Sequence, residues 1–236
     1  AYPEAGENVL TDISFKAKKG QTIAVIGSTG SGKSTLINLI PRYYDVTKGS
    51  VKVDGVDVRD MTQKELRDKL GYVPQKGVLF SGTIDSNIRY GKPEITDAQV
   101  KEAAEVAQAT EFIDTKPEKY ESPVSQGGTN VSGGQKQRLS IARAIAKDPE
   151  IFIFDDSFSA LDFKTDSQLR KALKEYTKDA TTVIVAQRIS TILGADQIIV
   201  LDDGHMAGIG THKELMANCE VYQQIARSQL SEEELA

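Results

Sequence analysis

A glycine-rich turn near the N-terminus constrains the fold of this 236-residue chain more than any other segment. Residues 21–27 are mostly apolar, have the length of a strand and end at Gly27, and two further glycines follow within five residues. Residues 34–40 have helical character, and this helix should stop before Pro41, whose ring removes a backbone donor. A buried strand, a tight turn and a helix in this order predict a strand–turn–helix unit of an α/β fold.

The turn itself has the pattern of a phosphate-binding loop. Residues 27–34 fit G-x-x-x-x-G-K-[ST] without a mismatch, after a strand and before a helix. Glycines let backbone N–H groups surround phosphate oxygens, and the helix directs the positive end of its dipole at them. Lys33 would reach the β- and γ-phosphates of a nucleotide, and the Ser34 hydroxyl would bind Mg²⁺. The candidate nucleotide-binding residues here are Ser28, Thr29, Gly30, Ser31, Gly32, Lys33, Ser34 and Thr35.

A pair of carboxylates follows a second apolar run. Residues 151–154 are all apolar and lead into Asp155 and Asp156. Open α/β sheets bind ligands beyond the carboxyl ends of their strands. We therefore expect Asp155 to hold the Mg²⁺ of a bound nucleotide, as the second anchor of a P-loop nucleoside triphosphatase.

Further apolar runs outline the rest of the domain. Residues 150–155, 181–186 and 197–201 have the composition of buried parallel strands. Partial alternation over residues 9–15 and the turn signal Asp54–Gly55 predict antiparallel pairing in the N-terminal quarter. Helices are expected at residues 136–147 and 221–235, and at three Thr-x-x-Glu/Gln capping boxes, which pair Thr96 with Gln99, Thr165 with Gln168 and Thr211 with Glu214.

We expect these elements to form one α/β domain over residues 1–236. Residues 96–148 carry no convincing strand, so we assign a helical lobe, inserted at residues 76–147. The sheet and its covering helices then come from residues 1–75 and 148–236, with an antiparallel β-subdomain at the N-terminal end.

Composition argues against several classes of function. Lys and Arg number 29 against 34 Asp and Glu, and the net charge of −5 opposes a surface that neutralises nucleic acid. No apolar run approaches the ~20 residues that span a bilayer, and the N-terminus lacks the basic and apolar regions of a secretory signal. The single cysteine, Cys219, cannot form an internal disulfide, which suits a reducing cytosol.

Several short motifs make the chain resemble the nucleotide-binding domains of ABC transporters. Residues 131–135, Val-Ser-Gly-Gly-Gln, resemble the signature sequence of ABC-type ATPases. Residues 72–75 resemble their Q-loop, and residues 159–162 resemble their D-loop. Tyr2 falls where ABC exporters carry the aromatic residue that stacks on adenine. The resemblance covers residues 2–229 and is strongest to exporters in which this domain follows a membrane domain in one polypeptide.

The resemblance implies a RecA-like P-loop core that uses ATP and Mg²⁺. Gln75 is expected to contact magnesium, together with Ser34 and Asp155, and to face the coupling helices of a transmembrane domain. A second nucleotide-binding domain is the other expected partner, because in this family the signature of one chain contacts ATP held by the P-loop of the other. This chain would then be a soluble fragment of a longer protein at the cytoplasmic face of the cell membrane. The residues expected to bind nucleotide in trans are Ser132, Gly133, Gly134 and Gln135.

Three positions depart from the family's pattern. Hydrolysing members carry Glu after the magnesium aspartate, whereas this chain has Asp156, whose carboxylate is withdrawn by about 1 Å. They carry His after the next strand, in contact with the γ-phosphate, whereas this chain has Gln187, which cannot become a cation. Gln126 replaces an acid before the signature. The only histidines, His205 and His212, lie elsewhere, and we expect both at the surface without catalytic duty.

These departures favour one hypothesis over two alternatives. The binding residues are intact while Asp156 and Gln187 weaken hydrolysis, a combination that resembles the degenerate half of a heterodimeric ABC exporter. Such a chain would hold ATP at its own slow site and complete the partner's competent site with its signature, so that ATP-driven dimerisation is coupled to export. The alternatives are a self-sufficient homodimeric exporter ATPase and a soluble ABC ATPase that acts on nucleic acid, against which the charge argues.

Overall fold

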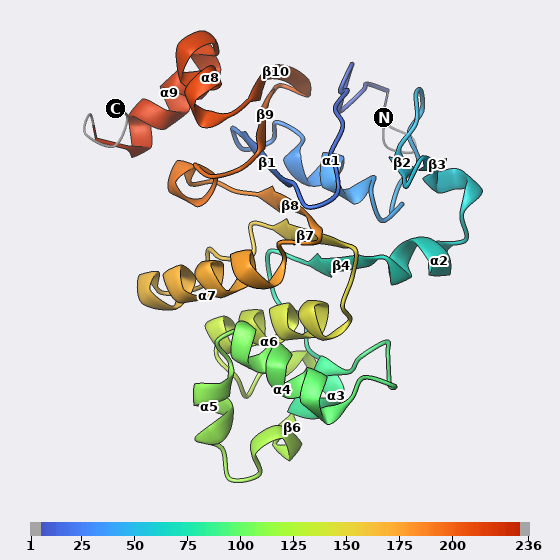
Figure 1. Cartoon of the computed structure of the whole chain (residues 1–236), viewed down its shortest axis with the longest axis vertical. Coiled ribbons are helices and arrows are strands. Elements are labelled where there is room, and N and C mark those ends of the chain that lie inside the picture. Colours follow the sequence, from blue (N-terminus) through green and yellow to red (C-terminus); the bar gives the residue numbers. More distant parts are fainter. Residues whose placement is uncertain (1–5, 232–236) are drawn as a thin grey trace. The chain divides into compact units, whose positions relative to one another are not determined.

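The computed structural model describes residues 6–231, which fall into two compact units (Figure 1). Of the described residues, 6–70 and 181–231 form the first unit, and 71–180 form the second. The predicted helical lobe, residues 76–147, falls within the second unit, and its limits stay a prediction. None of the helices among residues 6–231 is long and apolar enough to cross a lipid bilayer.

A mostly parallel sheet forms the centre of the first unit. Strand β1 (Thr22–Gly27) lies between β8 (Thr181–Val185) and β9 (Gln197–Asp202) and runs parallel to both. Strand β10 (His205–Gly210) pairs with β9 in the antiparallel sense. The runs predicted as strands at residues 181–186 and 197–201 are confirmed. Their side chains are mostly buried, which explains why the sequence reads there as nearly continuous apolar runs.

The N-terminal part of this unit contains one hairpin but no strand at residues 9–15. Strands β2 (Lys52–Val53) and β3 (Val56–Asp57) pair antiparallel, and Asp54 and Gly55 at the turn have φ values of 52° and 79°, as the turn signal predicts. The alternation over residues 9–15 does not produce a strand. Asp12 has a φ of 54°, which interrupts an extended backbone, and the N–H of Thr11 donates to the carbonyl of Gly204 outside any ladder.

Short helices complete the first unit. Helix α1 (Lys33–Asn38) is slightly shorter than the predicted segment, and α2 (Gln63–Asp68) begins at an unpredicted capping box. Helix α8 (His212–Asn218) begins at the predicted box of Thr211 and Glu214. Helix α9 (Glu220–Gln229) accounts for most of the predicted C-terminal helix, and residues 232–235 of that prediction lie outside the described residues.

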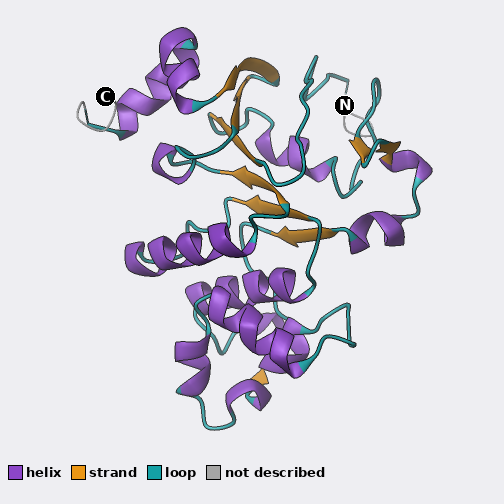
Figure 2. Cartoon of the chain, viewed as in Figure 1, coloured by secondary structure: helices purple, strands orange, loops and turns teal. Residues whose placement is uncertain are grey.

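The second unit is mainly helical (Figure 2). Strands β4 (Leu70–Val73) and β7 (Ile151–Asp155) are neighbours, and helix α6 (Gly133–Ala146) packs against α3 (Ile84–Ile88) and α4 (Asp97–Val106). Residues 96–148, expected to lack a strand, contain β6 (Pro123–Val124), which pairs with β5 (Gly82–Thr83). Two residues are too few to show an alternating pattern. The remaining helices are α5 (Thr110–Asp114) and α7 (Phe163–Tyr176).

Two helices of this unit begin earlier than predicted. Helix α7 does not start at a Thr165–Gln168 box, because Asp162 is its N-cap. The Asp162 carboxylate accepts the backbone N–H of Thr165 at 3.0 Å and its hydroxyl at 2.7 Å, and these bonds hold the pKa of Asp162 below its usual value. Helix α6 starts at Gly133 rather than Lys136, so the predicted signature forms its first turn. The capping box predicted at Thr96 and Gln99 is confirmed.

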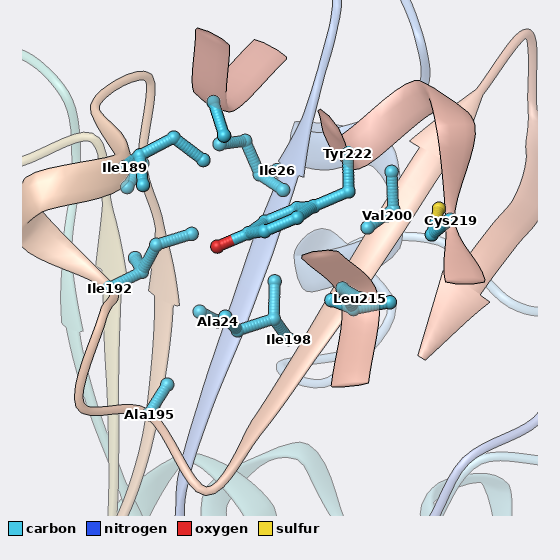
Figure 3. Close-up of a cluster of buried hydrophobic side chains, with 12 residues drawn as sticks. Ala24, Ile26, Ile189, Ile192, Ala195, Ile198, Val200, Leu215, Cys219 and Tyr222 are labelled. Carbon is cyan, nitrogen blue, oxygen red and sulfur yellow. The ribbon is translucent and has the colours of Figure 1, made fainter. Parts of the chain in front are cut away.

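Tyr222 is the largest fully buried side chain of the first unit and fixes α9 to the sheet. Its ring extends among apolar side chains of β1, β9 and residues 189–192, including Ile26, Ile189 and Ile198 (Figure 3). Its hydroxyl lies 2.8 Å from Nδ1 of His212, and burial raises the pKa of Tyr222 to about 12. His212 is therefore half-buried with a structural partner and is not the surface residue expected from the sequence.

Truncation of this side chain should destabilise the fold. We expect Tyr222→Ala to lower the free energy of unfolding by about 3–5 kcal/mol, because it empties a large buried volume. Tyr222→Phe keeps the ring, loses the hydrogen bond to His212 and should cost about 1 kcal/mol. Urea denaturation measures both values. Gln224→Ala, on the exposed side of the same helix, should stay within about 0.5 kcal/mol of the parent, and a loss no larger than this for Tyr222→Ala would contradict the packing role.

Candidate functional site

The turn between β1 and α1 requires glycine for steric reasons. A Cβ atom at Gly27 would lie 2.2 Å from the carbonyl oxygen of Leu201, on the neighbouring strand β9. Gly30 and Gly32 have φ values of 81° and 101°, which side chains other than glycine rarely adopt. No heavy atom lies within 4 Å of the Cβ position of Gly30, so this part of the turn is open. The loop thus leaves room above its backbone for a ligand.

Lys33 bridges the two sides of this loop. Its Nζ donates hydrogen bonds to the carbonyl oxygens of Gly27 at 2.8 Å and of Ser28 at 2.7 Å. These bonds hold an ammonium group over a backbone whose residues 28–30 are exposed. A cation beside open peptide N–H groups suits phosphate oxygens, which carry the opposite charge. The residues present therefore fit the triphosphate of a nucleotide.

The remaining loop residues divide into buried and exposed positions. Ser31 is 1% exposed and anchors the loop, since its N–H donates to the carbonyl of Ser28 and its carbonyl accepts from Gly204. Ser34 is exposed at the start of α1, where a hydroxyl can reach a metal ion, and Thr35 is partly exposed. Tyr2, predicted to stack on adenine, lies outside the described residues.

Gln187, in the same unit, lies two residues after the end of β8. Its side chain is exposed, and its backbone carbonyl accepts a hydrogen bond from Nε2 of Gln229 at 2.8 Å. The structure places neither histidine at this position, because His205 belongs to β10 and His212 to α8. The segment after β8 therefore carries the neutral side chain of Gln187 where the family's pattern has histidine.

The carboxylate pair of the second unit contacts the predicted Q-loop. Asp155 ends β7, and its Oδ2 lies 3.4 Å from the hydroxyl of Tyr72. Asp156 follows with a φ of 47°, and its Oδ2 accepts a hydrogen bond from Nε2 of Gln75 at 3.2 Å. The structure thus brings the side chains of Gln75 and Asp156 into contact.

Two buried residues that the sequence analysis missed hold this arrangement. Ser157 is fully buried, and its hydroxyl donates to the carbonyl of Val73 at the end of β4. Gln137 of α6 is 1% exposed, and its Nε2 donates to the carbonyl of Pro74, next to Gln75. The sequence signal for Gln137 is a polar residue on the apolar face of a helix. Such a residue indicates a contact, because a buried polar side chain requires a hydrogen-bond partner. Gln137 links the signature helix to the Q-loop.

The signature residues form an exposed helix start. Ser132 caps α6 by accepting the N–H of Gln135 at 3.1 Å, and the Gln135 side chain accepts the N–H of Ser132 at 3.1 Å. Ser132 and Gly133 are exposed, and no atom lies within 4 Å of the Cβ position of Gly133. At Gly134 a Cβ would lie 3.6 Å from the carbonyl of Ala160, in the predicted D-loop. Signature and D-loop are therefore adjacent within the second unit.

The comparison with known proteins decides the family. The chain matches the ABC transporter family over residues 10–159. The chain belongs to the ABC transporter family. This membership carries the mixed α/β fold of its P-loop ATPases, as predicted.

Family members of known sequence or structure are similar over nearly all of the chain. An uncharacterized ABC transporter ATP-binding protein of Mycobacterium tuberculosis is 50% identical over 97% of the chain. A Staphylococcus aureus protein whose name proposes multidrug export by an ATP-binding/permease polypeptide is 47% identical over 95%. The structure of a bacterial Atm1-family ABC exporter with ATP bound has a TM-score of 0.93 at 38% identity, over 98% of this chain and 41% of that one. The chain spans 39% of the length of these two relatives.

Removal of the loop cation should weaken nucleotide binding. We expect Lys33→Ala to lower ATP affinity about ten- to 100-fold, because hydrogen bonds to a charged phosphate are lost. Isothermal titration calorimetry with Mg·ATP measures this loss. Lys69→Ala is the matched control, since its ammonium pairs with Asp54 on the surface at 2.9 Å. Equal affinity of Lys33→Ala and the parent would argue that the loop binds no phosphate.

Proposed function

We propose that this chain is the ATP-binding domain of an ABC exporter and the degenerate half of a heterodimer. In this proposal it binds Mg·ATP firmly at its own site, hydrolyses it slowly, and completes the hydrolytic site of a partner domain. The observation that carries the proposal is a contrast between two parts of the site. The phosphate loop is intact and bridged by Lys33, whereas the carboxylate of Asp156 is one methylene shorter than the Glu of hydrolysing members.

Nucleotide binding would use the loop and magnesium residues that the sequence predicts. The loop residues 28–35 would surround the phosphates, with the Lys33 ammonium against the β- and γ-oxygens. Mg²⁺, when bound with ATP, would neutralise charge on the phosphate oxygens, and its protein ligands would be Ser34, Gln75 and Asp155. Tyr2 is proposed to stack on adenine.

Slow hydrolysis would follow from the two changed side chains. Asp156 would orient the attacking water, but its carboxylate is withdrawn by about 1 Å, and a misplacement of this size can cost roughly 100-fold in rate. Gln187 can donate a hydrogen bond to the γ-phosphate but brings no positive charge toward the developing negative charge. The bond from Gln75 to Asp156 supports a positioned but short base.

The signature would act on the partner's nucleotide. Ser132, Gly133, Gly134 and Gln135 match the family's motif and form the N-cap and first turn of a 14-residue helix, of which Ser132 and Gly133 are exposed. A helix N-terminus attracts anions because its N–H groups and dipole point outward. We propose that this end meets the γ-phosphate held by the partner, so that ATP joins the two domains.

An exposed aromatic face of the second unit suits the transmembrane partner. This face consists of Val78, Phe80 and Tyr90, and the rings of Phe80 and Tyr90 stack with centroids 4.1 Å apart. Arg143 lies under both rings and donates to the carbonyls of Val78 and Asn87 at 2.8 Å each. Clusters of exposed apolar side chains mark protein contacts. We propose that the coupling helices of a membrane domain bind here, which would hold the chain at the cytoplasmic face of the membrane.

Restoring the usual side chains should raise hydrolysis. We expect Asp156→Glu with Gln187→His to increase the rate of phosphate release by at least about tenfold. Glu at position 156 extends the carboxylate toward the attacking water, and His at position 187 adds a titratable cation. Phosphate release is measured with the chain alone and with a partner domain that carries Glu and His.

The same measurement includes matched control variants and tests the alternative function. Asp203→Glu and Gln224→His, both at exposed positions, should leave the rate unchanged. The alternative function is a self-sufficient homodimeric ATPase, favoured by the contact that already holds Asp156 against Gln75. Brisk turnover of the unchanged chain alone, lost in Asp156→Ala and not raised by the double substitution, would support that alternative against the degenerate site.

A further inference from the structure

The segment after β8 starts with a helical turn that has no cap of its own. Residues Ile189–Thr191 form a 3₁₀ turn, and Arg188, at its N-cap position, makes no side-chain capping bond. The first N–H groups of a helical turn have no partner within the turn and require one elsewhere. This requirement matters here because Gln187, which stands where the family carries His, lies two residues before the turn begins. We call residues 187–191 the switch segment.

Gln229 supplies the missing cap from 40 residues further along the chain. Its Oε1 accepts the N–H of Ile189 at 2.8 Å, and its Nε2 donates to the carbonyl of Gln187 at 2.8 Å. One side-chain amide thus holds the backbone on both sides of Arg188. A carboxylate can accept the first bond but cannot donate the second, and an apolar side chain can form neither.

The packing of α9 places its last turn where Gln229 can make these bonds. Tyr222 and Ala226 are fully buried, and Gln229 follows Ala226 by three residues, so all three lie on one side of the helix. Their buried cluster includes Ile189 itself and β1 residues Ala24 and Ile26, which lead into the phosphate loop (Figure 3). The strand before the loop, the switch segment and the C-terminal helix therefore share one apolar core.

We propose that Gln229 is a positioning residue that sets where Gln187 meets the γ-phosphate. The inference rests on the proposed function, which assigns Gln187 to that phosphate. Gln229 acts through the backbone of residues 187–189 and does not itself contact nucleotide. Its loss should therefore weaken binding of nucleotides that have a γ-phosphate and leave ADP binding nearly unchanged.

The test compares a β,γ-imido analogue of ATP with ADP in calorimetric titrations of this chain. Gln229→Ala should lower affinity for the analogue about three- to tenfold and affinity for ADP less than about twofold. Gln229→Glu keeps an acceptor for Ile189 but loses the donor to Gln187, so it should show the same nucleotide effect. In a Gln187→Ala background, Gln229→Ala should have no additional effect on the ratio of the two affinities.

Amide hydrogen exchange gives an independent reading. The Ile189 amide should exchange about tenfold faster in Gln229→Ala and keep its protection in Gln229→Glu. Gln223→Ala is the matched control, because the Gln223 side chain donates to the carbonyl of Met216 and not to the switch segment. It should change neither the affinity ratio nor exchange at Ile189.

The outcomes separate this inference from the proposed function. Equal losses of analogue and ADP affinity in Gln229→Ala, or unchanged exchange at Ile189, would overturn the positioning role. If Gln187→Ala keeps the parent's affinity ratio, the assignment of Gln187 to the γ-phosphate fails as part of the proposed function, and exchange at Ile189 alone then decides whether Gln229 positions the segment.

Discussion

The contact between Gly27 and the backbone of β9 is the constraint on which the first unit depends. A parallel strand that lies between two others brings its end close to its neighbour, and the carbonyl of Leu201 leaves no space for a Cβ at Gly27. The chain can then turn sharply above the sheet edge and hold Lys33 across the loop with two short bonds. The loop geometry proposed for phosphate recognition is thus a consequence of strand packing as much as of the loop residues.

Backbone capping gives several functional motifs a structural basis. Ser132 and Gln135 of the signature satisfy each other's backbone N–H groups, and the Asp162 carboxylate of the D-loop accepts the N–H of Thr165 at the start of α7. Gln229 extends this principle across the chain, because it caps a turn that has no local side chain to do so. Some residues whose motifs suggest a role in catalysis or coupling therefore also determine where helices start. Substitutions at these residues should change both the proposed function and the helix start.

Sequence reasoning predicted the elements whose pattern is local. The strands at residues 181–186 and 197–201, the Asp54–Gly55 turn and two of the three capping boxes are confirmed, because each depends on residues within a few positions of one another. It failed at Thr165, where the better-placed carboxylate of Asp162 takes the cap. It failed over residues 9–15 because the left-handed backbone of Asp12 has no periodic signal.

The sequence by itself determined the kind of site: the phosphate loop, the carboxylate pair, the signature and the two changed residues at positions 156 and 187. These follow from residue types at fixed spacing, which set what each group can donate, accept or carry as charge. Only the tertiary structure decided which distant groups support them. The bonds of Gln75 to Asp156, Gln137 to Pro74 and Gln229 to Gln187 join residues 42 to 81 positions apart. No local pattern encodes such pairs, because they form only when packed strands and helices bring the side chains together.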